Sequence, residues 1–412
     1  MPTVRVAVFD LGSSSFHLMV GDASRDGRLD PVLRRRSFLH LGTEVARTGG
    51  VPGDRSALAV RTVKRLHVAA EDAGSDVVVA MATAALRDAD NGDRLLARLE
   101  RILGSPINLL SGEEEARLCF LGQRAGVWVG EAPVLGLDLG GGSLEAGIGT
   151  VDAVSAVASV ALGTARIRGE LDTGDRLSVG ERARIGELAV ERSGPIAAML
   201  AGCPGAGDRV IASGGTVRAL ARLAMGLHRP PPRSGSSGTP SVNQVELPAG
   251  QLHELADRLS TLDLDARMAL PGIQARRAPL LPIGAVVFST VVAHLDLRGL
   301  VVSEWGLREG AVLDSLSLPA AGSPPLGVLA QDPVHARAAH GALALGRTTT
   351  VGHLDHLAVE LPLLPALDAV ALVRSHGSSS CSERRPCGRP MERRYRSPSG
   401  ERGMGAGSAC RS

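Results

Sequence analysis

The chain has 412 residues, of which 44% are hydrophobic, so it is long and apolar enough for two or three domains with buried cores. Its formal net charge is only +2, which does not indicate a partner such as nucleic acid or a membrane surface. Lys64 is the only lysine and stands between Val63 and Arg65. A Walker A loop needs a Gly-Lys-Ser/Thr run, so P-loop nucleotide hydrolases are excluded.

The N-terminus and the cysteines favour a cytoplasmic protein. The first residues, MPTVRVAVFD, pass directly into a strand pattern without the charged and then apolar segment of a signal peptide. No apolar run approaches the roughly 20 residues that a membrane-spanning helix needs. Five scattered cysteines are too few for a disulfide framework. We therefore expect a cytoplasmic localisation and no membrane partner.

Short apolar runs alternate with helical patterns as far as residue 318, which predicts an α/β fold. In chain order, the predicted elements are strands Val4–Phe9 and Phe16–Gly21, helix Arg55–Ala73, strand Val77–Ala82, helices Gly92–Leu103 and Gly112–Gly122, strands Val134–Leu137, Leu144–Ile148 and Val154–Val160, helix Val179–Leu200, strand Val210–Ala212, helices Thr216–Gly226, Ala249–Ser260 and Leu280–Leu295, and strand Gly299–Ser303.

Two segments differ in composition from the rest. Residues 228–244, HRPPPRSGSSGTPSVNQ, are rich in Pro, Ser and Gly and predict a mobile loop. Residues 318–412 lack steady periodicity and end in an Arg/Ser/Gly-rich stretch, so we expect a low-complexity, largely disordered tail. No basic-aromatic pattern there or elsewhere indicates specific nucleic-acid recognition.

One internal repeat organises the remainder. Residues 6–20 read VAVFDLGSSSFHLMV and residues 134–148 read VLGLDLGGGSLEAGI, each an apolar strand, an Asp-Leu-Gly-x-x-Ser turn and a second strand. The repeat predicts two similar α/β domains, 1–126 and 127–317, that face each other across a central cleft. Each domain would present one small-residue turn to that cleft.

The two turns have the composition of a phosphate site. Small residues allow consecutive backbone N–H groups to approach an anion, and serine hydroxyls add donors. Tight hairpins also favour Gly and Asp, but two matched copies make that explanation weaker. A Rossmann turn is excluded, because Glu145 and a strand follow where a glycine and a helix are required. The candidate phosphate-binding residues are Gly12, Ser13, Ser14, Ser15, Gly140, Gly141, Gly142 and Ser143.

An aspartate precedes each turn, Asp10 in the first and Asp138 in the second. A carboxylate would repel a bare phosphate. Hydrated Mg²⁺, in contrast, is commonly held by one or two carboxylates together with water and phosphate oxygens. We therefore expect both aspartates to hold Mg²⁺.

These turns, together with four further segments in the same order, resemble the exopolyphosphatase / guanosine-pentaphosphate phosphohydrolase family. The further segments are ATAALRDADNG (82–92), SGEEEARL (111–118), ASGGTVRAL (212–220) and SEWGLREGAVLD (303–314). The resemblance covers about residues 4–315. It implies two ribonuclease-H-like domains of the superfamily that includes actin, chaperone ATPases and acetate and sugar kinases.

The resemblance also implies roles for single residues. Glu115 matches the family's catalytic base, and Arg87 matches an arginine suited to phosphate oxygens. Asp10, Asp138 and Glu145 match metal-associated positions. A further phosphate turn in the second domain corresponds to Gly214, Gly215 and Thr216.

Phosphoanhydride hydrolysis requires charge stabilisation on the transferred phosphoryl group and an oriented water. Glu115 can orient that water as a general base. We expect Glu113 and Glu114 to raise its proton affinity. Without the motif, these three glutamates would be an ordinary solvated first turn of a helix.

The chain departs from the family pattern at three positions: Ser14 replaces an asparagine, Leu144 a threonine and Pro279 an aspartate. Residues 319–412 also contain no His-Asp dipeptide, so the chain resembles the short, two-domain form. His17, just after the first turn, is predicted to pack beneath it.

The interpretation is a Mg²⁺-dependent hydrolase of inorganic polyphosphate. Guanosine pentaphosphate is the alternative substrate, because the catalytic residues are shared. A kinase of the same superfamily is disfavoured by the SGEEEA and GLREG segments. A phosphate or alarmone sensor without turnover is the alternative from another class, and a homodimer would fit the family.

Overall fold

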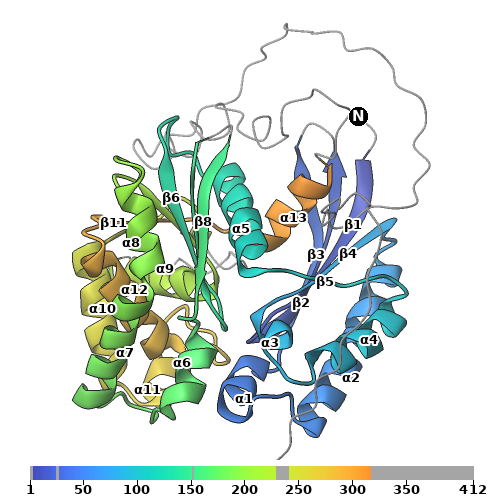
Figure 1. The fold of residues 1–412 in the computed structure, drawn as a ribbon, viewed down its shortest axis with the longest axis horizontal. Coiled ribbons are helices and arrows are strands. Elements are labelled where there is room, and N and C mark those ends of the chain that lie inside the picture. Colours follow the sequence, from blue (N-terminus) through green and yellow to red (C-terminus); the bar gives the residue numbers. More distant parts are fainter. Residues whose placement is uncertain (1–2, 25–26, 151–152, 229–240, 317–412) are drawn as a thin grey trace, which may run out of the picture. The chain divides into compact units, whose positions relative to one another are not determined.

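The computed structural model describes residues 3–24, 27–150, 153–228 and 241–316. The predicted α/β fold is confirmed, because these residues form two mixed sheets with helices packed against them (Figure 1). The predicted tail, and most of the loop predicted at 228–244, lie outside the described residues. No helix within the four described ranges is long and apolar enough to cross a bilayer.

The first sheet has five strands in the order β3-β2-β1-β4-β5. Strands β1 to β3 form an antiparallel meander, whereas β4 and β5 join in parallel after helical crossovers. Its elements are β1 (Thr3–Leu11), β2 (Ser15–Ser24), β3 (Leu29–Phe38), α1 (Leu41–Thr48), α2 (Gly53–Asp72), β4 (Val77–Ala82), α3 (Ala84–Arg87), α4 (Gly92–Leu103) and β5 (Asn108–Leu109).

The second sheet repeats this arrangement. Strands β6, β7, β8, β9 and β11 take the places of β1 to β5, and β10 adds an antiparallel edge strand. The remaining elements are α5 (Gly112–Gly126), β6 (Val134–Leu139), β7 (Leu144–Gly149), β8 (Val154–Val160), α6 (Thr164–Leu171), α7 (Val179–Arg192), α8 (Gly194–Ala201), β9 (Val210–Ser213), α9 (Gly215–His228), β10 (Glu246–Pro248), α10 (Ala249–Thr261), α11 (Leu264–Met268), α12 (Leu281–His294), β11 (Gly299–Val302) and α13 (Leu307–Leu316).

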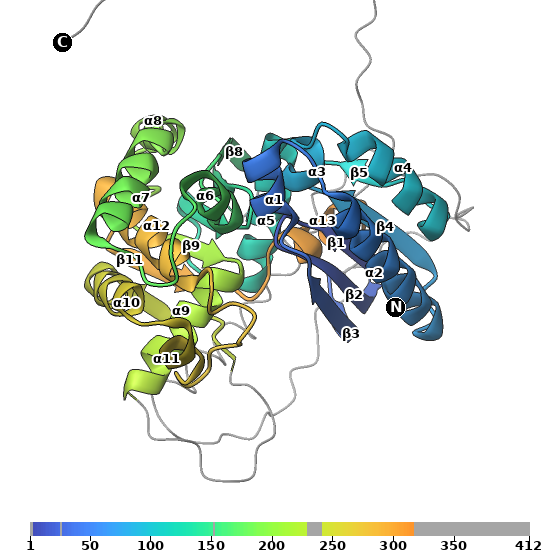
Figure 2. The same cartoon turned by 90° about the horizontal axis from the view of Figure 1, so that it is seen from below.

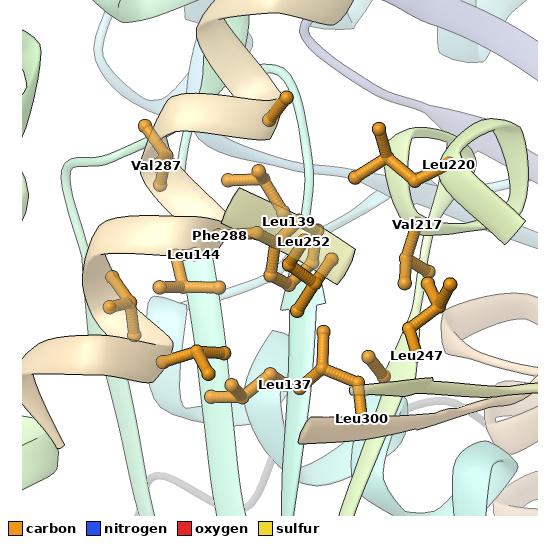
Figure 3. Packing of buried hydrophobic residues seen from close by; sticks show 14 of the residues in the cluster. Leu137, Leu139, Leu144, Val217, Leu220, Leu247, Leu252, Val287, Phe288 and Leu300 are labelled. Carbon is orange, nitrogen blue, oxygen red and sulfur yellow. The ribbon is translucent and has the colours of Figure 1, made fainter. Parts of the chain in front are cut away.

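Strand β6 shows how the larger core forms. Leu135, Leu137 and Leu139 alternate along the strand and point to one face, where they join a buried apolar cluster with α9, α10 and α12. Leu252 of α10 and Phe288 of α12 complete this packing (Figure 3).

Helices α5 and α13 lie between the two sheets (Figures 1 and 2). Helix α13 follows the second sheet in the sequence, yet its Ala311 and Val312 pack with Val6 and Val8 of β1. The chain thus returns to the first sheet inside range 127–317, which the sequence assigned to the second domain. The domain boundaries themselves stay a prediction.

Glycines allow α5 to lie unusually close to its neighbours. A Cβ on Gly136 of β6 would stand 2.8 Å from Phe120 Cδ2, and one on Gly147 of β7 would stand 2.7 Å from Phe120 Cβ. On the other side, a Cβ on Gly310 of α13 would overlap the carbonyl of Leu118. Helix α5 is therefore fixed from both sides.

All eight predicted strands are present, and the differences lie elsewhere. The helix predicted over Val179–Leu200 is wrong as one element, because Pro195 lacks the N–H that a continuous helix needs and the chain restarts at Gly194. Strand β3 was not predicted. It holds Pro31 and three consecutive arginines, which suit an edge strand but mask its strand pattern.

We predict that Gly310→Ala lowers the stability of the protein by about 1–3 kcal/mol, the usual cost of overpacking a buried contact. The added methyl group would have to separate α13 from α5. Denaturant unfolding measures the loss, and Gly180→Ala on α7, whose added Cβ meets nothing within 4 Å, is the matched control. Equal stability of the two variants would contradict the close packing of α5 and α13.

Candidate active site

The two predicted turns have the same geometry. In the first, the Gly12 N–H donates to the Ser15 carbonyl at 3.2 Å, and in the second the Gly140 N–H donates to the Ser143 carbonyl at 3.0 Å. The strand register is also the same, so that Asp10 lies opposite His17 and Asp138 opposite Glu145. The internal repeat of the sequence is thus a repeat of structure.

A helix N-terminus supports each turn. Backbone N–H groups at the start of α1 donate to the carbonyls of Ser13 and Ser14, and those of α6 donate to the carbonyls of Gly140 and Gly141. Because helices engage these carbonyls, the turns have N–H groups and hydroxyls to offer a ligand. Such a ligand should be anionic.

The two turns meet at the cavity and require small residues there. A Cβ on Gly141 would stand 2.8 Å from the backbone nitrogen of Ser14, and one on Gly142 would stand 2.5 Å from Ser13 Oγ. The third predicted phosphate segment, Gly214–Thr216, lines the same cavity at the N-terminus of α9. Gly214 has φ +95° there, a backbone conformation that favours glycine.

Five acidic residues line this cavity, Glu304 and the four that the sequence predicted for the site: Asp10, Asp138, Glu145 and Glu115. Burial, followed by nearby carboxylates, raises the pKa of Asp10 to about 6 although Arg308 opposes the shift. Burial likewise raises the pKa of Asp138 and of Glu145, against hydrogen bonds from Ser213 and Ser143 respectively. Burial in the cavity therefore makes ionisation of these carboxyl groups less favourable than in water.

Helix α5 carries Glu115 into the cavity. The Ser111 side chain accepts a hydrogen bond from the Glu114 N–H at 3.1 Å, and Glu114 Oε2 accepts one from the Ser111 N–H at 2.8 Å. This capping box fixes the start of the helix, and Glu115 follows on its buried side with 8% exposure.

The pKa of Glu115 is raised, but for another reason than the sequence suggested. Burial is the main cause, and Glu145, Asp10 and Asp138 add to it, while Arg87 lowers it. The carboxylates that raise this pKa are thus close in space, and they are not Glu113 and Glu114, which the sequence analysis had named.

Arg87 does not line the cavity. Its Nη1 donates to the Leu110 carbonyl at 2.7 Å and lies 3.7 Å from Glu115 Oε2. The structure brings Arg87 to the predicted base instead of to the phosphate turns. Glu115 Oε2 itself is buried and has no hydrogen-bond partner within the part of the chain that is described.

A second residue of α5 orients Asp138. Gln123 Nε2 donates to Ser213 Oγ at 2.8 Å and to the Leu137 carbonyl at 2.9 Å, and the Ser213 hydroxyl donates to Asp138 Oδ2. Sequence analysis assigned no role to Gln123 or Ser213, although Ser213 lies in the quoted ASGGTVRAL segment. Its place at the end of strand β9 was the available signal.

Arginines line part of the same cavity, here called the arginine wall, and sequence analysis missed this wall. Arg218, Arg277 and Arg308 line the cavity, and Arg36 of β3 lies close enough to affect their charge. Burial and mutual repulsion lower the pKa of Arg36 and of Arg218 to about 10, and that of Arg277 well below its usual value. Arg218 and Arg308 belong to the ASGGTVRAL and SEWGLREGAVLD segments of the sequence analysis. Arg36 lies in β3, the strand that was not predicted.

The predicted magnesium residues can be tested against the chemistry of the site. Among the residues that the structure describes, no three His, Cys, Asp or Glu side chains are grouped tightly enough to cage a metal. Mg²⁺ does not need such a cage, since it keeps several waters and binds substrate phosphate. Two buried carboxylates, Asp10 and Asp138, beside anion-binding turns fit that mode of binding.

The residues that depart from the family pattern have different positions. Ser14 lines the cavity, Leu144 is fully buried in the core, and Pro279 is half-buried and outside the cavity lining. Their effect on activity stays a prediction.

Comparisons with known proteins place the whole chain among its relatives. Exopolyphosphatase 1 of Mycobacterium tuberculosis is 31% identical over 322 residues, which are 78% of this chain and 90% of that protein. The crystal structure of the Aquifex aeolicus member of the Ppx/GppA family has a TM-score of 0.61 at 27% identity, covering 76% of this chain and 98% of that one. An exopolyphosphatase from Cytophaga hutchinsonii shares the fold, with a TM-score of 0.69 at 22% identity over 77% of this chain and 100% of that one.

A sequence model of the Ppx/GppA phosphatase family matches residues 20–318, which include the second turn, Glu115 and the arginine wall. The resemblance inferred from the six motifs is confirmed, and the chain belongs to the Ppx/GppA phosphatase family.

Proposed function

We propose that the protein is a Mg²⁺-dependent phosphoanhydride hydrolase that releases terminal orthophosphate from inorganic polyphosphate. One observation carries the proposal: a buried glutamate oxygen without a hydrogen-bond partner among the described residues, Glu115 Oε2, belongs to a side chain that lines a cavity with two phosphate-type turns. A binding protein has no need of such a carboxylate, whereas a hydrolase needs one to orient water.

The turns would bind the terminal phosphoryl group. Their N–H groups, the Ser13 and Ser15 hydroxyls, and the N-terminus of α9 line one cavity. Donors that are already fixed stabilise the charge of the transferred group without reorganisation during the reaction. Their attachment to helices and strands suits that role.

Glu115 would accept a proton from the attacking water. A general base works best when its pKa lies near the working pH. Burial and the other carboxylates raise the pKa of Glu115, while Arg87, 3.7 Å away, favours its ionised form. Both influences together suit a base at neutral pH.

Asp10 and Asp138 would hold Mg²⁺ beside the turns, with Glu145 as a further nearby carboxylate. When bound, the ion would neutralise phosphoryl oxygens and lower the cost of four ionised carboxyl groups in a buried cavity. Gln123 and Ser213 would keep Asp138 oriented for this contact.

A polyanion suits the arginine wall. Arg218, Arg277 and Arg308 repel one another, and successive phosphates of a chain would relieve that repulsion. The name of the mycobacterial relative, Exopolyphosphatase 1, supports polyphosphate as the substrate. Guanosine pentaphosphate offers the same terminal anhydride and is the second substrate to test.

We predict that Glu115→Gln lowers phosphate release by at least about a hundredfold, because the amide cannot accept the proton from water. Release from long-chain polyphosphate, guanosine pentaphosphate and ATP is compared for both proteins in Mg²⁺. Glu113→Gln, in the exposed first turn of α5, is the matched control and should retain activity.

The same assay separates the alternatives. Release from one substrate that disappears in Glu115→Gln supports a hydrolase and identifies the substrate. If wild type releases no phosphate from any of the three but binds them as tightly as the variant does, the protein is a sensor and the proposal fails.

We predict that Mg²⁺ raises the thermal midpoint of the wild-type protein and has little effect on Asp138→Asn, which loses one of the two proposed ligands. At a hundredfold excess over its dissociation constant, a bound ion stabilises the folded state by about 2.7 kcal/mol. Asp72→Asn, at the exposed end of α2, should respond like wild type. An equal response of all three proteins would remove Asp138 from the metal site.

We predict that Asp10→Asn stabilises the metal-free protein in a pH-dependent manner. The folded pKa of about 6 lies above the usual value of 3.8, so the folded state binds more protons and wild type loses stability as pH rises through this interval. The variant avoids that loss, which reaches about 3 kcal/mol above pH 6, since one pKa unit equals about 1.4 kcal/mol.

Urea unfolding in a chelator at pH 4 and at pH 7.5 measures the effect. The variant should exceed wild type clearly at the higher pH and only slightly at the lower one. A gain of the same size at both values would show that the Asp10 charge does not cause it.

A further inference from the structure

We propose that His17 is a positioning residue, which Arg308 holds in one tautomer so that the Ser15 hydroxyl donates its hydrogen to the bound phosphoryl group. The proposal deepens the proposed function and rests on it, because it requires a phosphoryl group in the cavity. Sequence analysis predicted only that His17 packs beneath the turn, whereas the structure includes it in the cavity lining.

The contact with Arg308 fixes the hydrogen on the histidine ring. Arg308 Nη1 is hydrogen-bonded to His17 Nδ1. A guanidinium group only donates, so Nδ1 must be the acceptor and the ring hydrogen must be on Nε2. The surroundings agree, because burial and four arginines hold the pKa of His17 well below its usual value.

The other ring nitrogen then determines the direction of the serine hydroxyl. His17 Nε2 lies 2.8 Å from Ser15 Oγ and donates to it. The hydroxyl oxygen is thus an acceptor toward His17, which leaves its own hydrogen for another partner. Ser15 lines the cavity, where a phosphoryl oxygen is the acceptor that the proposed function supplies.

The strand geometry holds these groups in place. His17 and Ser15 lie two residues apart and therefore share one face of β2. His17 also lies opposite Asp10 across the β1–β2 ladder. The ring is half-buried and is held at both nitrogens, so it fixes the serine rotamer before substrate arrives.

The second turn shows the contrast. The positions of Ser15 and His17 correspond to Ser143 and Glu145 in the repeat. The hydrogen bond from Ser143 lowers the pKa of Glu145, which is the effect of a hydroxyl that donates to the carboxylate. The two serines thus have opposite roles, and only Ser15 is left with a free hydroxyl hydrogen.

Two variants of His17 test the relay. A glutamine amide reaches the position of Nε2, so His17→Gln can still accept from Arg308 and donate to Ser15. The shorter amide of His17→Asn reaches only the position of Nδ1 and loses Ser15. Kinetics on polyphosphate should give near wild-type kcat/KM for His17→Gln. For His17→Asn and Ser15→Ala we expect a fall of about tenfold to a hundredfold, the usual effect of losing a hydrogen bond to a charged group.

The double variant distinguishes positioning from an independent effect. Because His17 acts through Ser15, Ser15→Ala combined with His17→Asn should be no worse than Ser15→Ala alone. Multiplied losses, or a His17→Gln variant as impaired as His17→Asn, would overturn the proposal. His67→Gln on α2, away from the cavity, is the matched control.

Two further measurements keep the proposal separate from the proposed function. Nitrogen-detected NMR of the histidine rings should show His17, assigned by its loss in His17→Gln, as the neutral form with hydrogen on Nε2. The other tautomer or the charged ring would overturn the proposal. If wild type hydrolyses nothing, calorimetric binding of tripolyphosphate to the same variants replaces kinetics. The same pattern of affinities then upholds the relay although the hydrolase proposal fails, and no binding refutes both.

Discussion

The close packing of α5 is the constraint on which the site depends. Helix α5 approaches β6 and β7 over Gly136 and Gly147 and approaches α13 at Gly310, so side chains on either side would push it away. Glu115 and Gln123 lie two turns apart on this helix and therefore share one face. Because the helix cannot shift, the first reaches the cavity and the second reaches the serine that orients Asp138. The closely packed helix α5 thus positions both the candidate base and a candidate metal ligand.

Charge is the second constraint, because carboxylates and arginines line the same buried cavity. Burial and like charges raise the pKa of Asp10, and burial and like charges lower the pKa of Arg218. A cation alone would relieve only the acidic side, and an anion alone only the basic side. The proposed pair of a metal ion and a phosphate would relieve both. Such a cavity is costly when empty, and the well-packed cores around it supply the stability that it requires.

The sequence was most informative where the role of a residue depends only on its neighbours in the chain, as in turns and helix caps. The glycine turns and the Ser111-Gly-Glu-Glu-Glu115 start of α5 identified the cavity because turn and capping chemistry are local. Arg36 and His17 could not be placed in the same way. The strand of Arg36 reads as a polar segment, and its role depends on arginines that are far apart in the chain. The raised pKa of Glu115 was inferred with the right direction and the wrong neighbours, because a helix separates adjacent residues around its axis and tertiary packing determines which charges meet.

The repeat also shows how one scaffold supports two chemistries. Both hairpins have the same register and the same hydrogen bond that closes the turn, and each turn rests on a helix N-terminus. They differ at the position opposite the aspartate, which is His17 in one and Glu145 in the other. A histidine held by an arginine makes the first turn a donor surface, whereas a glutamate makes the second acidic. Hydrolysis of a phosphoanhydride needs both, donors for the phosphoryl oxygens and carboxylates for the metal and the water. A repeated fold with different residues at this position therefore supplies the asymmetry that the proposed reaction would use.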